Sequence, residues 1–132
     1  MTYSRSYLKK LQTYTKTGRT TRRNLKNTTP NKFEQSMYDI LEAEQIKYER
    51  EYNILGTSKW FDCFLPEWGN KNILLEFDGD YWHVESLNEA TSKMQIRNWK
   101  NDRFKDKLAL KYGYKLIRIR QSDNITSIKA LL

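Results

Sequence analysis

Acidic residues interrupt two short apolar segments of this 132-residue chain, and they constrain its fold and chemistry more than any other feature. Asp62 lies within Trp60–Leu65, and Glu76 and Asp78 lie within Ile73–Asp78. Both segments have the length and apolar character of buried strands. Asp is a poor strand former, and burying a carboxylate is costly unless it is paired or binds a metal. The acids therefore predict either a functional site or strand ends that reach solvent.

The expected geometry favours a metal site. Glu76 and Asp78 share one face of their strand, about 7 Å apart, and Asp62 lies beside them if the two segments form a hairpin. Clustered carboxylates repel one another, and a divalent cation relieves the repulsion. Oxygen ligands suit Mg²⁺, with Mn²⁺ as the alternative. For Asp78 alone, which precedes Gly79, an exposed turn acid is the competing interpretation.

The remaining periodicity predicts one mixed α/β domain at residues 31–132. Asn31 and Glu34 have the spacing of a helix N-cap with a capping box, and this helix is expected to end near residue 46. In the second helix, a stripe formed by Phe104, Leu108 and Tyr112 is expected to pack on the sheet. We expect strands at 48–54, 60–65, 73–78 and 115–120, and helices at about 88–112 and from 124.

The first thirty residues carry the whole net charge of +8. They contain eight basic and no acidic residues, whereas the rest of the chain has sixteen of each. We expect a basic arm that binds nucleic-acid phosphates; a targeting segment and a solvated tail are the alternatives. The expected phosphate contacts in this arm are Arg19, Arg22, Arg23 and Lys26.

Composition excludes several classes of protein. The single cysteine, Cys63, excludes an internal disulfide and a cysteine-based zinc site. No apolar run approaches the roughly 20 residues of a membrane span, so we expect no membrane partner.

Two further groups of polar residues lie near the acidic strands. His83 follows Asp78 by five residues and is the only histidine; a lone histidine is more often structural, but near a metal it can serve as a general base. Asn98, Asp102 and Asp106 recur at intervals of four residues and share one helix face. For Asp106, a solvated polar face is the simpler interpretation. For Asp102, a solvated position and a functional role are equally good interpretations.

Taken in order, these motifs resemble the very-short-patch repair endonucleases and the related phage homing endonucleases of EDxHD type, within the PD-(D/E)xK superfamily. The resemblance covers about residues 31–120 and implies a restriction-endonuclease-like fold, with a mixed central sheet flanked by helices. Its most specific part is the Gly-x-x-Trp-His block followed by the Gly-Tyr strand. The matching signals are Glu34, Asp62 in Phe-Asp-Cys-Phe-Leu-Pro, Glu76-Phe-Asp-Gly-Asp-Tyr-Trp-His83, Asn98-x₃-Asp102 and Gly113-Tyr114.

The resemblance implies a role for each matching position. Asp62 would be the principal metal ligand and the backbone carbonyl of Phe77 a second, with Glu76 and Asp78 as further candidates. Asp78 would lie near the scissile phosphate. His83 would activate the attacking water. The other implied roles are those of Asp102 in orienting His83, of Glu34 in reaching the metal through water, and of Tyr81 and Trp82 as wedges in the DNA stack. Independently of the resemblance, we expect Asn98 and Arg103 on the later helix to contact DNA.

Two departures from the superfamily narrow the expected function. The usual lysine two residues after the second-strand acid is replaced by Asp78, so the base must be His83 or a lysine from elsewhere. The structural zinc ligands of the repair enzymes are missing, which favours a phage or mobile-element nuclease. We therefore expect a Mg²⁺-dependent endonuclease that acts on double-stranded DNA. We expect it in the cytoplasm of a bacterial or phage-infected cell. The resemblance also implies that cleavage leaves a 5′-phosphate and a 3′-hydroxyl.

Several alternatives remain open at this point. A non-catalytic nucleic-acid-binding module would need the basic arm but no carboxylate cluster. An RNA-directed nuclease differs only in substrate, and the preference for DNA comes from the resemblance alone. A scaffold that binds an acidic partner through the arm is a more distant alternative. A double-strand break would require a homodimer or two successive nicks.

Overall fold

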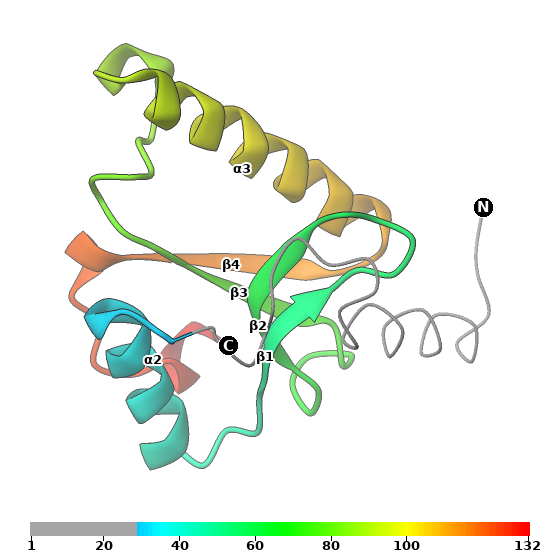
Figure 1. The fold of residues 1–132 in the computed structure, drawn as a ribbon. Helices are drawn as coiled ribbons and strands as arrows, with labels where there is room; N and C mark the ends of the chain where they lie inside the picture. Colours follow the sequence, from blue (N-terminus) through cyan, green and yellow to red (C-terminus); the bar gives the residue numbers. More distant parts are fainter. Residues whose placement is uncertain (1–28) are drawn as a thin grey trace.

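The computed structural model describes residues 29–132, so the expected phosphate contacts in the basic arm lie outside the described residues. The described part is an α/β fold with a four-stranded mixed sheet (Figure 1). Among the described residues, no helix is long and apolar enough to cross a membrane. The main elements are α2 (Lys32–Ala43), β1 (Glu49–Asn53), β2 (Trp60–Leu65), β3 (Ile73–Asp78), α3 (Lys93–Lys111) and β4 (Lys115–Arg120).

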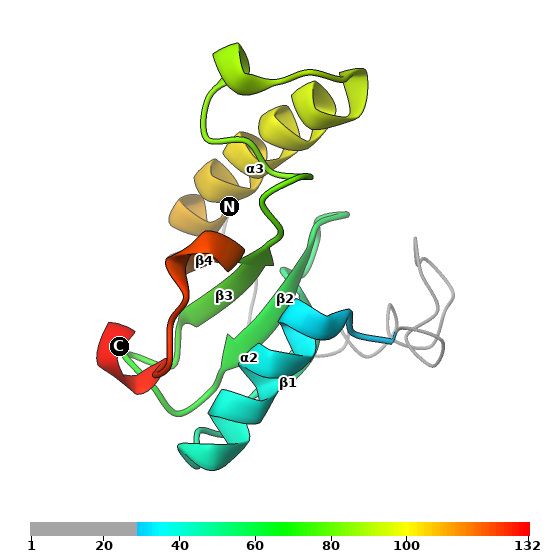
Figure 2. The ribbon, with the colours of Figure 1, turned by 90° about the vertical axis from the view of Figure 1, so that its left-hand side faces the viewer.

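The sheet order is β1-β2-β3-β4. The first three strands are antiparallel neighbours, and β4 lies parallel to β3 after the crossover through α3. Figures 1 and 2 show the sheet as the middle layer, with α2 on one side and α3 on the other. The predicted bounds of β2, β3 and β4 are confirmed, and β1 lies within its predicted range.

Helix α2 begins as predicted, because the Asn31 side chain accepts from the Glu34 amide and Glu34 accepts from the Asn31 amide. It ends at Ala43, earlier than expected. Its apolar face covers one side of the sheet and forms the larger core. The buried residues of this core include Met37, Tyr38 and Leu41 from α2 and Cys63, Leu65, Leu75, Phe77 and Ile119 from the strands.

Helix α3 begins at Lys93 rather than near residue 88, and Ser92 caps its first turn. The segment between β3 and α3 forms turns and a short 3₁₀ helix, η2 (Leu87–Glu89). Gly113 follows the helix with a positive φ of 82°, as the predicted C-terminal glycine should. The predicted helix from residue 124 is only a 3₁₀ turn, η4 (Lys129–Leu131).

The predicted packing of α3 is confirmed for two residues of its apolar stripe and is wrong for the third, Phe104. Phe104 is 53% exposed, although Leu108 and Tyr112 do pack at the edge of the smaller core. The helix instead buries a mostly polar stripe of Gln95, Asp102, Lys105 and Ala109 against the sheet. This side of β3 carries carboxylates, so the helix face that packs there must supply charges and hydrogen bonds as well as apolar area.

Candidate functional site

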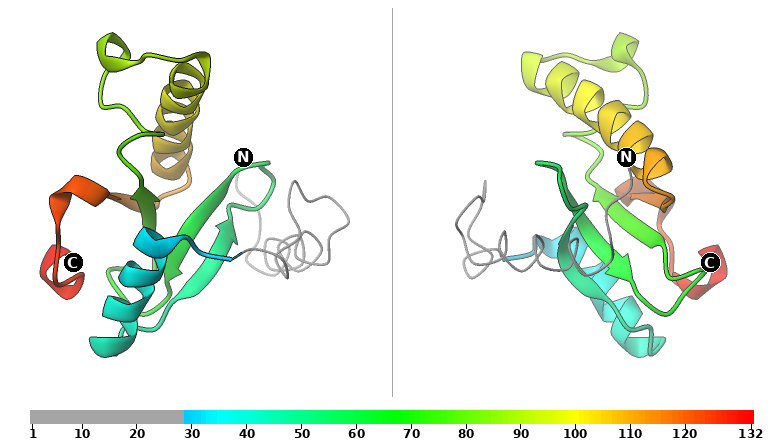
Figure 3. Two further views of the ribbon diagram at one scale, coloured as in Figure 1. Left: turned by 60° about the vertical axis from the view of Figure 1, so that its left-hand side comes forward. Right: turned by 90° about the vertical axis from the view of Figure 1, so that its right-hand side faces the viewer.

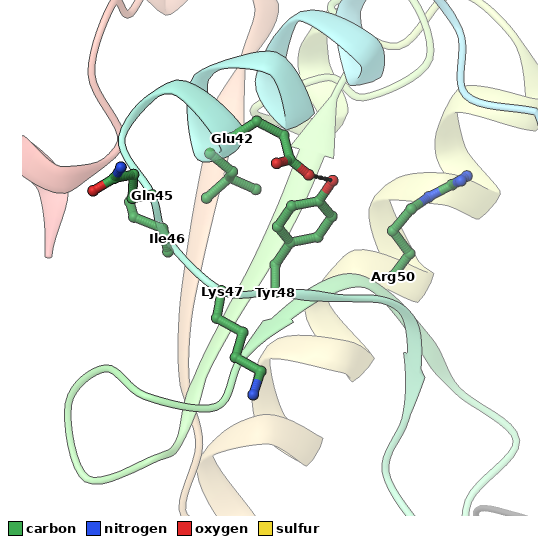
Figure 4. A pocket seen from close by; sticks show the side chains of 7 residues that line it. Glu42, Gln45, Ile46, Lys47, Tyr48 and Arg50 are labelled. Carbon is green, nitrogen blue, oxygen red and sulfur yellow. Dashed lines mark hydrogen bonds between the residues drawn. The ribbon is translucent and has the colours of Figure 1, made fainter.

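A cavity of about 510 Å³ opens between α3, the start of α2 and the acid-bearing ends of β2 and β3. Its lining brings together most of the predicted site residues from five separate segments of the chain. These are Glu34, Asp62, Glu76, Phe77, Trp82, His83, Asn98 and Asp102, joined by Lys105 and Glu51. A more open hollow of about 650 Å³, between the end of α2 and the start of β1, contains none of the predicted site residues (Figure 4).

The acids of the two central strands hold the backbone where the strands stop pairing. The last backbone pair of the β2–β3 ladder toward the cavity is Cys63 with Leu75. Beyond it, the Asp62 amide donates to Glu76 Oε1 at 3.0 Å, and the Phe77 amide donates to Asp62 Oδ2 at 2.7 Å. The carboxylates therefore replace backbone carbonyls as acceptors, which explains how apolar strands tolerate them.

The two carboxylate oxygens of Asp62 differ in their hydrogen bonding. Within residues 29–132, no donor reaches its Oδ1, while Oδ2 is held by Phe77. Burial raises its pKa well above the ordinary carboxyl value, and the charge of Glu76 raises it further. A carboxylate in this position is poorly stabilised by the protein alone, and a divalent cation would compensate for it.

A buried lysine completes this group of charges, and the sequence analysis did not identify it. Lys105 Nζ donates to Glu76 Oε1 at 2.8 Å, and both side chains are almost fully buried. The same ammonium lies 4.6 Å from the centre of the Phe61 ring. A signal was available, because Lys105 follows Asp102 by three residues and so shares its helix face.

His83 forms a dyad with Asp102. Its Nδ1 lies 2.8 Å from Asp102 Oδ2, and the ring is about one-quarter exposed. The turn after β3 brings it there, since the His83 amide donates to the Gly79 carbonyl. Helix α3 holds the turn, because Gln95 donates to the Tyr81 carbonyl and Asn98 to the Trp82 carbonyl.

Each member of the dyad favours the charged form of the other. Burial alone would lower the pKa of His83, but the Asp102 hydrogen bond and the Asp78 charge raise it above 6.5. Burial likewise opposes ionisation of Asp102, yet its bond to His83 and the Arg118 charge lower its pKa. An ionised Asp102 can only accept, so the proton of this bond belongs to His83 Nδ1, and Nε2 is left to act on a reactant.

Asp78 lies behind the dyad. It contacts Arg118 at 3.1 Å and lies 3.9 Å from His83 Nδ1, and it lines a separate hollow of about 220 Å³ with Arg118. Burial raises its pKa despite both cations. Ligand atoms of Asp78, His83 and Asp102 lie within 4.8 Å of one another, so these residues form a second candidate metal position. Arg118 already neutralises both acids there, which makes Asp62 the stronger candidate ligand.

Trp82 lines the cavity as a largely exposed residue, whereas Tyr81 and Arg103 are not part of the cavity lining. Tyr81 and Trp82 are 64% and 49% exposed, with their rings edge to face 4.7 Å apart. Arg103 pairs with Asp106 at 2.9 Å and lines the smaller hollow. Asp106 also contacts Arg118 at 2.8 Å, so it is part of the charge network rather than a purely solvated residue.

Glu51 is a second residue that sequence reasoning missed. It is buried on β1 and lines the cavity. The β1–β2 ladder pairs residues on either side of Glu51 and Asp62 but not these two, and Glu51 has a φ of 56°. No sequence signal separates it from the neighbouring exposed Glu49, because the irregularity of the backbone determines which side chain faces inward.

Comparison of the chain with protein-family models, with curated proteins and with solved structures found no match, so the site is interpreted from its own geometry.

Proposed function

We propose that this protein is a Mg²⁺-dependent DNA endonuclease with a restriction-endonuclease-like fold, related to the EDxHD-type phage and repair endonucleases. One observation carries the proposal: Asp62, Glu76, Lys105 and the His83–Asp102 dyad open into a single cavity. Phosphodiester hydrolysis needs a cation site, a proton acceptor and positive charge near the phosphate. These residues can supply all three.

Asp62 is the residue best suited to hold the cation, through Oδ1, the carboxylate oxygen that does not accept the Phe77 hydrogen bond. The Phe77 backbone and Glu34 line the same cavity and are the further candidates. All of these donors are oxygens, which suits Mg²⁺ and Mn²⁺ better than a softer metal. When bound, such an ion would neutralise charge on the phosphate and lower the pKa of a water molecule beside it.

His83 is the proposed general base. Asp102 accepts from Nδ1 and so directs Nε2 toward the reactant. A cation held at Asp62 would oppose protonation of His83 and bring its raised pKa back toward neutrality. The ring would then be able to accept a proton from the attacking water at physiological pH.

Lys105 supplies the positive charge that the superfamily usually places on the second strand. Its hydrogen bond to Glu76 fixes that carboxylate and supplies its counter-charge, so Glu76 orients the Asp62 backbone instead of adding an unpaired charge. The exposed Tyr81 and Trp82 lie where a nucleic acid entering the cavity would meet them, and aromatic rings of this kind stack on bases.

The test is cleavage of supercoiled plasmid, and of a labelled RNA of matched length, with Mg²⁺ and with EDTA. We expect Mg²⁺-dependent cleavage of DNA that is lost in His83→Ala and Asp62→Asn. Glu67→Gln, an exposed acid far from the cavity, is the matched control and should cut like the parent. Full activity in Asp62→Asn would refute the site assignment. Cleavage of RNA alone, or DNA retention without cleavage, would refute the proposed substrate or the proposed reaction.

A further inference from the structure

Helix α3 has a continuous basic stripe on the side opposite its buried residues. Figures 1 and 3 show α3 as an outer layer of the molecule, on the other side of the sheet from α2. Residues three and four positions apart form one line on a helix surface. The exposed residues of this line, the α3 stripe, are Lys93, Arg97, Lys100, Phe104, Lys107 and Lys111.

The stripe concentrates positive charge that no carboxylate of residues 29–132 pairs with. Five of its six residues are cations, and within residues 29–132 none of the five forms an ion pair. The other cations of α3 and β4, apart from Lys115 at the start of β4, behave differently, since Arg103, Lys105, Arg118 and Arg120 all pair with carboxylates. Like charges four residues apart destabilise a helix, so an anionic partner along this face would be favourable.

Phe104, the one uncharged residue of the stripe, is linked to the cavity lining through Lys59. Lys59 Nζ lies 5.3 Å from the centre of the Phe104 ring and donates to Asn101. Asn101 lines the cavity. Positive charge therefore extends from the cavity rim at Lys59 around to the outer side of α3.

We infer that the α3 stripe binds the sugar–phosphate backbone of the DNA duplex whose scissile bond enters the cavity. The stripe is about 27 Å long, close to the rise of eight nucleotides along one strand, and a linear array of cations fits a linear array of phosphates. Contacts of this kind position a duplex without selecting its sequence. The inference rests on the proposed function and adds a second DNA contact outside the cavity.

A charge-neutralising variant tests the stripe against a matched control. The stripe variant combines Lys93→Gln, Lys100→Gln and Lys107→Gln, and the control combines the same change at exposed lysines away from α3, namely Lys47, Lys71 and Lys129. Binding of a fluorescent duplex is titrated in EDTA over a range of salt concentrations. Each phosphate contact contributes about 0.9 to the slope of log K against log salt.

We expect the stripe variant to lose about 2 to 3 from the magnitude of that slope and to bind at least about tenfold more weakly at low salt. The control should retain the parent slope. An unchanged slope in the stripe variant, or an equal loss in the control, would overturn the inference. Loss of binding to poly-glutamate with DNA affinity unchanged would assign the stripe to an acidic protein partner and would also overturn it.

A second measurement uses the parent protein, so it does not depend on whether a variant folds correctly. Acetylation of lysines in the parent protein, with and without duplex, is followed by mass spectrometry. We expect the duplex to protect Lys93, Lys100 and Lys107 but not Lys47 or Lys71. Equal labelling with and without DNA would overturn the inference.

Cleavage assays separate this inference from the proposed function. If the parent cuts DNA, the stripe variant should reach the parent rate at saturating DNA but need about tenfold more DNA to do so. If the parent never cuts but the stripe variant alone loses salt-dependent binding, the stripe inference stands and the proposed reaction fails. If the parent cuts and the stripe variant binds DNA like the parent, the stripe inference fails but the proposed function stands.

Discussion

His83 Nδ1 lies 2.8 Å from Asp102 Oδ2, so the only histidine of the chain reports directly on the charge of the candidate site. NMR titration of its ring in EDTA should give a pKa above 6.5. In Asp102→Asn the hydrogen bond to a carboxylate is gone, and the pKa should fall below the parent value. Glu89→Gln, an exposed acid outside the dyad, should leave the titration unchanged.

The same pair predicts how stability depends on pH. The folded pKa of His83 is above its unfolded value, so while Asp102 stays ionised the protonated ring contributes its full stabilisation below pH 6.5. That contribution is lost as the pH rises through the folded pKa. Denaturant unfolding in EDTA should show the parent losing stability over this interval, with a smaller loss in Asp102→Asn. Parallel curves for the two proteins would contradict the ion pair.

Substitution of Arg118 should change the pKa of His83 in the direction opposite to that of Asp102→Asn. Its guanidinium contacts Asp78 at 3.1 Å and Asp102 at 3.6 Å, and it also donates to the Asp102 carbonyl. In Arg118→Met the loss of this charge should raise the pKa of His83 further and cost about 3 to 5 kcal/mol of stability, because buried carboxylates are left unpaired. Arg118→Lys keeps a positive charge, so both the rise in the His83 pKa and the loss of stability should be smaller than in Arg118→Met. The same NMR and unfolding measurements check it, and a fall in the His83 pKa would contradict it.

The strands were predictable because local residues determine them. β2 ends at Leu65, immediately before Pro66, and β3 ends immediately before Gly79. The acids on these strands also indicated the site, since a carboxylate in an apolar strand is costly without a partner. The start of α2 was predictable for a similar reason, because its capping box involves residues only three positions apart.

The orientation of α3 was not predictable from hydrophobic periodicity. That rule places Phe104 inward, yet the helix face that packs on the sheet meets charged residues. Lys105 is buried against Glu76, and Asp102 is buried against His83 and Arg118. The partners of these charges lie far away in the sequence. Burial of Lys105 becomes understandable only once Glu76 is known to lie opposite it.

The Lys105–Glu76 pair predicts a large loss of stability when only one partner is removed. Lys105→Met leaves the Glu76 carboxylate buried beside Asp62 without its counter-charge, at a cost of about 3 to 5 kcal/mol. Adding Glu76→Gln should recover part of that loss. Lys107→Met, which changes an exposed lysine two residues further along α3, should stay within about 0.5 kcal/mol of the parent in urea unfolding. Equal effects of the two lysine variants would contradict the buried pair.

The ionised Asp62 carboxylate, the proposed cation ligand, is expected to reduce the stability of the metal-free protein. Its folded pKa is raised by burial and by Glu76, so ionisation destabilises the fold as the pH rises from the ordinary carboxyl value of 3.8 through the raised one. Asp62→Asn keeps an acceptor for the Phe77 amide and removes the charge. In EDTA at neutral pH it should therefore unfold at higher urea concentration than the parent.

Mg²⁺ should reverse this order. Binding to the folded state alone raises the stability of the parent in proportion to the logarithm of the ion concentration, whereas Asp62→Asn lacks the charged ligand and should respond little. Glu67→Gln is the control that should respond like the parent. A parent protein whose unfolding midpoint is the same in Mg²⁺ and in EDTA would show that Asp62 does not hold the cation. A variant less stable than the parent in EDTA would show instead that the buried charge is well compensated by Lys105.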